Sequence, residues 1–151
     1  MITYEDLHQQ NHKITELSNA LHLLLGDQSL CESEITRDLF FEYVEQVKGH
    51  LEKTDKNLYT QLLTHHEQKV RNTADRFLGG SKEIKRLFAA YLKRWCQMKS
   101  KSLAVKEHDL FIKETEEMFE MVLNRLQDET EHLYPLIRNV TGDNHHAVAV
   151  A

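Results

Sequence analysis

Four long stretches of the chain carry apolar residues at helical spacing, and this periodicity limits the fold more than any other feature of the sequence. The stretches run over about 4–25, 35–63, 67–100 and 106–139. Two adjacent glycines break a helix, so the third should be interrupted near Gly79-Gly80, and Pro135 should kink or end the fourth. With no competing strand pattern, the sequence predicts an all-α, up-down-up-down four-helix bundle with antiparallel neighbours.

The length and composition of the chain agree with one helical domain. Its 151 residues are enough for a hydrophobic core, and one proline, five glycines and 40% hydrophobic residues suit a helical globule. We expect residues 1–140 to form the bundle. Residues 141–151, which have no amphipathic pattern, should form a flexible C-terminal tail.

Charge and cysteine content exclude several classes of function. The net charge is −5 with both signs interspersed, which argues against a nucleic-acid partner. No apolar run reaches about 18 residues and the amino terminus is polar, so neither a membrane span nor a signal peptide is expected. Cys31 and Cys96 have no metal-type spacing and make no disulfide framework, so a cytoplasmic protein is predicted.

Histidines and carboxylates recur at one height along the predicted helices. Counting from the turns at ~1.5 Å per residue places His12 within about one turn of His50, with Glu83, Arg125 and Glu129 in the same layer. A buried carboxylate is unfavourable unless it is paired or bound to a metal. Two imidazoles with carboxylates have the composition of a non-haem iron site, with manganese or zinc also compatible.

The same residues carry a resemblance to a known family. Those residues are His12, the segments 50–59, 74–77, 91–95 and 125–135, and Glu83-Ile84. Over about 7–137 they resemble the hemerythrin-like HHE cation-binding domains, most closely bacterial members with glutamates on the third and fourth helices. The resemblance implies a carboxylate-bridged iron pair that binds or senses oxygen, nitric oxide or redox state. It also implies that His12, His50, Glu83 and Glu129 are its ligands.

Two positions depart from the pattern of this family. Thr54 stands where the second-helix motif has a glutamate, although Asp55 could replace it, and loss of a bridging carboxylate would leave one metal or none. Arg125 stands where histidine-rich members have a ligand, and a guanidinium cannot bind a cation. Its predicted role is to pair with a ligand carboxylate. Tyr59 and Tyr134 are predicted to be core anchors, and either hydroxyl could donate a hydrogen bond to a ligand carboxylate.

Three functions follow from these observations. The first is a sensor or carrier in which mononuclear or dinuclear iron binds a small diatomic molecule or peroxide. The alternative is a metal-independent protein-interaction or regulatory bundle with a degraded site, where Arg125, Glu129 and Asp55 neutralise one another. A peroxidase- or oxidase-like enzyme is the least favoured, because Cys31 and Cys96 show no reactive context and no nucleophile–base pair is recognisable.

Overall fold

The computed structural model of the chain describes residues 4–54 and 59–142. The long helices are α1 (Tyr4–Gly26), α2 (Glu34–Thr54), α4 (Gln68–Trp95) and α5 (His108–Asp128). The short elements are α3 (Thr60–Leu63), the π-helical segment η2 (Glu129–Leu133), α6 (Tyr134–Thr141), and the paired strands β1 (Cys96–Gln97) and β2 (Ser102–Leu103). The all-α prediction is confirmed, apart from this short ladder. Asp55 and residues 143–151 of the predicted tail lie outside the described part.

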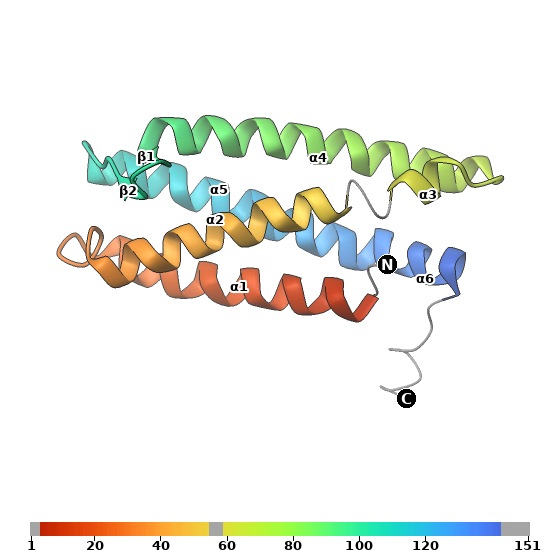
Figure 1. Ribbon diagram of the computed structural model, residues 1–151, viewed down its shortest axis with the longest axis horizontal. Helices are drawn as coiled ribbons and strands as arrows, with labels where there is room; N and C mark the ends of the chain where they lie inside the picture. Colours follow the sequence, from red (N-terminus) through yellow and green to blue (C-terminus); the bar gives the residue numbers. More distant parts are fainter. Residues whose placement is uncertain (1–3, 55–58, 143–151) are drawn as a thin grey trace.

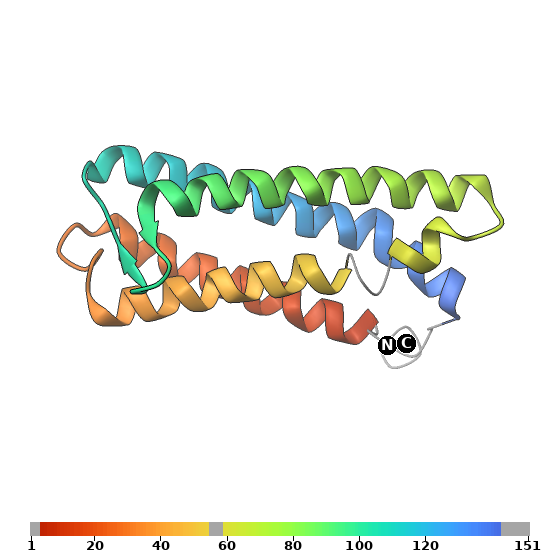
Figure 2. The same ribbon diagram turned by 45° about the horizontal axis from the view of Figure 1, so that its top comes forward.

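The four long helices lie alongside one another along the length of the molecule (Figures 1 and 2). The α1–α2 turn and the antiparallel β1–β2 hairpin, which joins α4 to α5, lie at the left end of both views. Elements α3 and α6 lie at the opposite end. Within the described ranges, none of the helices has the length and apolar character needed to span a bilayer.

One series of buried positions on each long helix alternates in steps of four and three residues. They are Leu7, Asn11, Ile14, Ser18, Leu21 and Leu25 on α1; Thr36, Phe40, Tyr43, Val47, His50 and Thr54 on α2; Val70, Ala74, Phe77, Ser81, Ile84, Phe88, Tyr91 and Trp95 on α4; and Phe111, Thr115, Met118, Val122, Arg125 and Glu129 on α5 and the start of η2. This spacing averages 3.5 residues, the repeat that keeps one face of a helix against its neighbours. Each helix therefore presents one stripe to the interior, which is widened by the adjacent buried residues Leu17, Phe41, Val44, Leu51, Leu92, Phe119 and Leu126.

The core consists of two apolar clusters with polar side chains between them. The larger cluster lies toward the hairpin end and includes Leu25, Phe40, Trp95 and Phe111. The smaller lies at the α3 and α6 end and includes Leu7, Tyr59, Leu62, Phe77, Leu133 and Tyr134. Between these clusters along the helices lie the buried residues Asn11, His50, Thr54, Ser81, Arg125 and Glu129, which we call the polar layer.

The predicted interruption at Gly79-Gly80 is wrong, because α4 runs without a break through both glycines. A Cβ atom at Gly80 would lie 2.8 Å from Nη1 of Arg125, whereas one at Gly79 would meet nothing within 4 Å. Gly80 is therefore a place where α4 makes room for a side chain of α5. Packing offsets the helix-breaking tendency of the two glycines, which amounts to roughly 1 kcal/mol each.

The helix around Pro135 continues to Thr141 after a change in its hydrogen bonding over η2. Pro135 has no backbone N–H, so it cannot donate to the carbonyl one α-helical turn before it. In the π-helical segment the hydrogen bonds join residues five positions apart, which brings such residues toward the same face of the helix. Glu129 and Tyr134 are five positions apart, and both are fully buried. The prolyl residue thus coincides with the point where the last helix turns two polar side chains inward.

Alanine substitutions at the two glycines should have different effects on stability. Gly79→Ala should raise the free energy of unfolding by about 0.5–1 kcal/mol, because alanine favours the helix and nothing opposes its methyl group. Gly80→Ala should be less stable than Gly79→Ala by at least about 1 kcal/mol, because its methyl group pushes on the buried Arg125. Urea unfolding followed by circular dichroism measures both; equal stabilities would contradict the close approach.

Candidate functional site

The centre of the polar layer is a buried chain of three ionisable side chains. Nε2 of His50 lies 2.7 Å from Oε1 of Glu129, and Nε of Arg125 donates to Oε2 of Glu129 at 2.9 Å. The exposed fractions are 2% for His50, 0% for Glu129 and 8% for Arg125. Both oxygens of one carboxylate are therefore engaged by protein donors from α2 and α5, and a guanidinium balances its charge.

Arg125 is held by groups from two further parts of the chain, the segment entering α3 and helix α4. Its Nη2 donates to the hydroxyl of Tyr59 at 2.5 Å and to the backbone carbonyl of Phe77 at 2.9 Å. Its guanidinium carbon lies 4.9 Å from the centre of the Phe77 ring, a cation–π arrangement. With Gly80 leaving space beside Nη1, the guanidinium fills a pocket shaped for it.

Tyr134 and Asn11 extend the network toward α1. The hydroxyl of Tyr134 lies 3.1 Å from Oδ1 of Asn11 and 3.4 Å from Oε1 of Glu129, so it can donate to either oxygen. Nδ2 of Asn11 donates to Oγ1 of Thr130 at 3.4 Å. Burial, the largest cause, raises the pKa of Tyr134, and the nearby Glu129 carboxylate raises it further. Tyr134 therefore stays a neutral hydroxyl.

The second ring nitrogen of His50 faces α1. Its Nδ1 lies 3.0 Å from Oε1 of the Gln10 side-chain amide. Nε2 faces the carboxylate oxygen Oε1 of Glu129. The imidazole ring therefore lies between two acceptor oxygens, one on α1 and one on η2, and each ring nitrogen has a partner.

Thr54 is bonded to its own helix. Its hydroxyl donates to the backbone carbonyls of His50 and Leu51, at 3.1 and 3.0 Å, and its side chain is fully buried. A threonine in this arrangement satisfies itself locally. The position that would hold a glutamate in the hemerythrin-like pattern thus supplies no anionic oxygen here.

The structure does not bring His12 or Glu83 into the layer. His12 is 74% exposed, and its Nε2 lies 3.0 Å from Oε1 of Glu16 on the same helix. Glu83 is exposed and accepts two hydrogen bonds from Arg86, at 2.6 and 3.1 Å, which lower the pKa of its carboxyl. Counting from the turns predicted the height of each residue along its helix but not its direction around the helix axis. Consecutive residues of an α-helix point about 100° apart, so a residue at the right height can face solvent.

The predicted metal ligands therefore do not fit a metal as the structure places them. Of the five, only His50 and Glu129 meet, Asp55 lies outside the described residues, and Oε2 of Glu129 already accepts from a guanidinium. A protein-bound zinc site, for comparison, has at least three protein ligands. The residues predicted to surround the ligands, Arg125, Tyr59 and Thr54, do lie in or beside the polar layer. Arg125 and Tyr59 contact each other, and Thr54 lies one turn from His50.

One largely exposed group in the described part of the chain has a composition suited to metal. It consists of His65, His66 and Glu67, in the turn between α3 and α4. The two imidazole rings stack with centroids 4.3 Å apart and planes at 26°. Nδ1 of His65 already accepts from the backbone N–H of Glu67 at 3.1 Å. These contacts stabilise the turn without any ion.

The residues that sequence reasoning missed lie on the buried stripes. Asn11 follows Leu7 by four residues and precedes Ile14 by three, so the stripe on α1 passes through Asn11 and not through His12. The same spacing on α4 selects Ser81 and Ile84 and leaves out Glu83. The signal was present in the sequence as a repeat of 3.5 residues. The bond from Arg125 to the carbonyl of Phe77 carried no such signal.

Comparison of the chain with family models, with curated proteins and with solved structures finds no match in any of the three. The hemerythrin-like resemblance therefore stays a prediction based on the residues themselves.

Removing the guanidinium should leave a buried carboxylate without its balancing charge. We expect Arg125→Met to lower the free energy of unfolding by about 3–5 kcal/mol, because the remaining Glu129 is fully buried. Arg125→Met combined with Glu129→Gln should recover part of that loss, and this holds even if the single variant fails to fold. Arg86→Met, which breaks the exposed pair with Glu83, is the matched control and should change little. Equal losses for both single variants would contradict the assignment.

The two thiols should be unreactive in the folded protein. Burial raises the pKa of Cys31 to about 11 and that of Cys96 to about 12. Since the thiolate is the nucleophile, alkylation by iodoacetamide should be slow at about pH 8 and become fast in urea. Because the folded state holds these protons more tightly, the thiols' contribution to stability is full below about pH 9 and declines toward pH 11–12. Rapid labelling of native protein would contradict this.

Proposed function

We propose that the chain is a metal-independent regulatory bundle of the hemerythrin-like, up-down-up-down type, whose function is to bind a protein partner. The observation that supports this is the contact of Arg125 with Glu129 inside the polar layer. The guanidinium supplies, from within the chain, the positive charge that a metal ion would supply to the same carboxylate. The layer then needs no ion to be electrically balanced.

The contacts around the layer support a structural role for it. Glu129 contacts His50, Tyr134 and Arg125, and Arg125 in turn contacts Tyr59 and the Phe77 carbonyl. An oxygen-binding centre needs a coordination position open to the incoming molecule. Here the groups around the carboxylate are already paired with one another. A function in this protein is then carried by its outer surface.

The competing proposal is an iron-containing sensor or carrier of a small diatomic molecule or peroxide. It is favoured by the short contact between two fully buried groups, Nε2 of His50 and Oε1 of Glu129, which are types of ligand that divalent iron accepts. For this function Arg125 would have to leave Oε2 of Glu129, and further ligands would have to join the pair. Manganese or zinc would meet the same requirement.

Metal analysis separates the two proposals. We expect protein purified without a histidine tag to contain metal far below one ion per chain. Its midpoint of thermal unfolding should not change with iron(II), manganese(II), zinc(II) or chelator, because a ligand at 100 times its Kd would stabilise the fold by about 2.7 kcal/mol. His66→Ala serves as control, since it removes the exposed histidine cluster and leaves the layer intact.

Stoichiometric iron that raises the unfolding midpoint in both the unmodified chain and His66→Ala would contradict the metal-independent proposal. The partner-binding part is tested by affinity capture from native extract with and without chelator. Retention of the same partner in both samples is the expected result. Loss of every partner after chelation would favour the competing proposal.

A further inference from the structure

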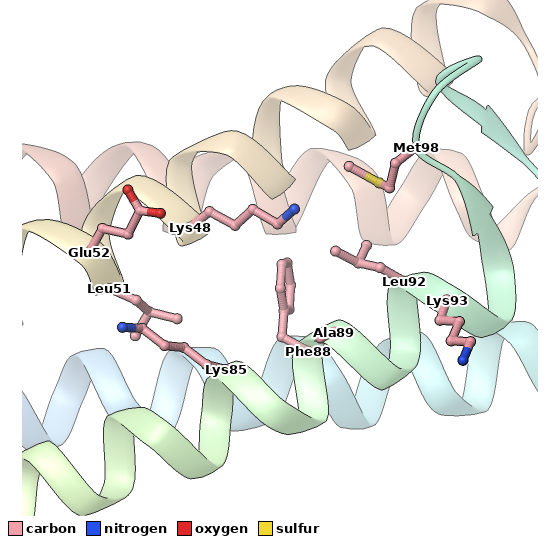
Figure 3. A pocket seen from close by; sticks show the side chains of 9 residues that line it. All are labelled: Lys48, Leu51, Glu52, Lys85, Phe88, Ala89, Leu92, Lys93 and Met98. Carbon is pink, nitrogen blue, oxygen red and sulfur yellow. The ribbon is translucent and has the colours of Figure 1, made fainter.

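A groove of about 570 Å³ lies between α2 and α4, on the face where these two helices diverge (Figure 3). Its floor is apolar and consists of Leu51 from α2 with Phe88 and Leu92 from α4. Met98, which is 41% exposed, closes the end nearest the β1–β2 hairpin. Figure 3 shows the Phe88 ring standing between Leu51 and Leu92, and Lys48 reaching over the opening.

The rim of the groove is predominantly cationic. Lys48 contributes from α2, and Lys85 and Lys93 contribute from α4, while Glu52 is the one carboxylate among the described lining residues. This sign is opposite to the net charge of the whole chain, which is −5. A rim of positive charge around an apolar floor favours a ligand with carboxylates beside apolar groups.

The distribution of charge among the helices confines this positive region. Helix α4 carries eight basic and two acidic side chains, whereas α5 carries six acidic and two basic ones. Helix α2 is also net acidic, with five acidic and three basic side chains. Both signs occur on each of these helices, but in different proportions. The basic side chains therefore lie in a strip along α4, where Arg76, Arg86 and Arg94 pair with carboxylates, and the neighbouring helices are net acidic.

We infer that the groove binds an acidic amphipathic helix from a partner protein. Apolar residues of that helix would enter the groove against Leu51, Phe88 and Leu92, and its carboxylates would meet Lys48 and Lys93. This inference rests on the proposed partner-binding function and names the surface and the partner chemistry. The spacing from Lys85 to Lys93 is about 12 Å, which matches roughly two turns of a docked helix with anchors at i, i+3, i+4 and i+7.

The flanking charges favour a peptide over an extended polyanion. Duplex DNA carries a charge about every 1.7 Å, and its phosphates would extend past the strip on α4 onto the acidic side chains of α5. A flat anionic membrane would meet the same carboxylates. Neither ligand uses an apolar floor recessed between two helices. A short helix fits within the strip and fills the recess.

Two adjacent alanines provide a matched pair of variants. Ala89 lines the groove, whereas its neighbour Ala90 lines a separate depression between α4 and α5 that includes Leu87 and Met121. Both residues are exposed on the same helix. Ala89→Glu would place a carboxylate inside the groove, and Ala90→Glu would make the same chemical change outside it. The two variants therefore separate the site from the overall charge.

The test starts with peptides selected on the full chain from a displayed library of helix-forming sequences, about 16 residues long, or roughly four turns. We expect the enriched peptides to place Asp or Glu beside apolar residues at i, i+3, i+4 and i+7. A fluorescein-labelled peptide of this set should bind about tenfold more weakly to Ala89→Glu and less than about twofold more weakly to Ala90→Glu. Lys48→Glu should weaken binding, and Lys113→Glu on α5 should not.

Each other outcome has a defined meaning. The inference would be overturned by selected peptides that lack acidic residues, or by equal peptide binding to Ala89→Glu and Ala90→Glu. Binding of duplex DNA or of anionic phosphatidylserine vesicles in place of peptide would also overturn it. Adding chelator tests the underlying function separately. Peptide binding that Ala89→Glu abolishes but that also requires metal would contradict the metal-independent proposal and leave the groove assignment standing.

Discussion

The burial of one carboxylate is the constraint on which the rest of this structure depends. Glu129 has no exposed surface, and an ionised carboxylate in that setting is strongly unfavourable unless charge and hydrogen bonds compensate it. Arg125 supplies the charge one helical turn away, and the groups that hold Arg125 come from α4 and from the segment entering α3. His50 adds a contact from α2. A single buried group thereby links elements from most of the chain.

The position of the polar layer between two apolar clusters explains how the helices find their register. In α1 and α4 the 3.5-residue repeat continues through both clusters, so apolar packing alone would tolerate a slide of either helix by one repeat. Such a slide would set His50 or Glu129 against apolar side chains and leave buried polar groups unpaired. Buried ion pairs add little net stability compared with apolar packing, but they penalise wrong arrangements heavily. The layer therefore contributes mainly to uniqueness of the fold.

The helical class and two residues of the polar layer, His50 and Glu129, could be predicted from the sequence. Periodicity located the starts of the long helices closely, but it carried the second to 63 and the third to 100, whereas α2 ends at Thr54 and α4 ends at Trp95. Counting from the turns located the height of His50 and Glu129. Height along a helix says nothing about direction around it, so His12 and Glu83, each next to a buried residue, were wrongly included. The continuity of α4 through Gly80 depends on Arg125, a contact between residues far apart in the sequence.

A guanidinium and a metal ion perform the same electrostatic task beside a buried carboxylate, but they differ in what else they permit. A metal retains positions for exchangeable ligands, whereas Arg125 uses its donors on Glu129, Tyr59 and the Phe77 carbonyl. Under the metal-independent proposal, a bundle with this internal cation needs no cofactor, and its interior takes no part in recognition. Recognition then depends on surface chemistry, where helix α4 differs most from its neighbours. Part of its positive charge is used within the fold, because Arg76 and Arg94 pair with Asp128 and Glu114 of α5, and its lysines on the rim of the groove are the part that an anionic partner can use.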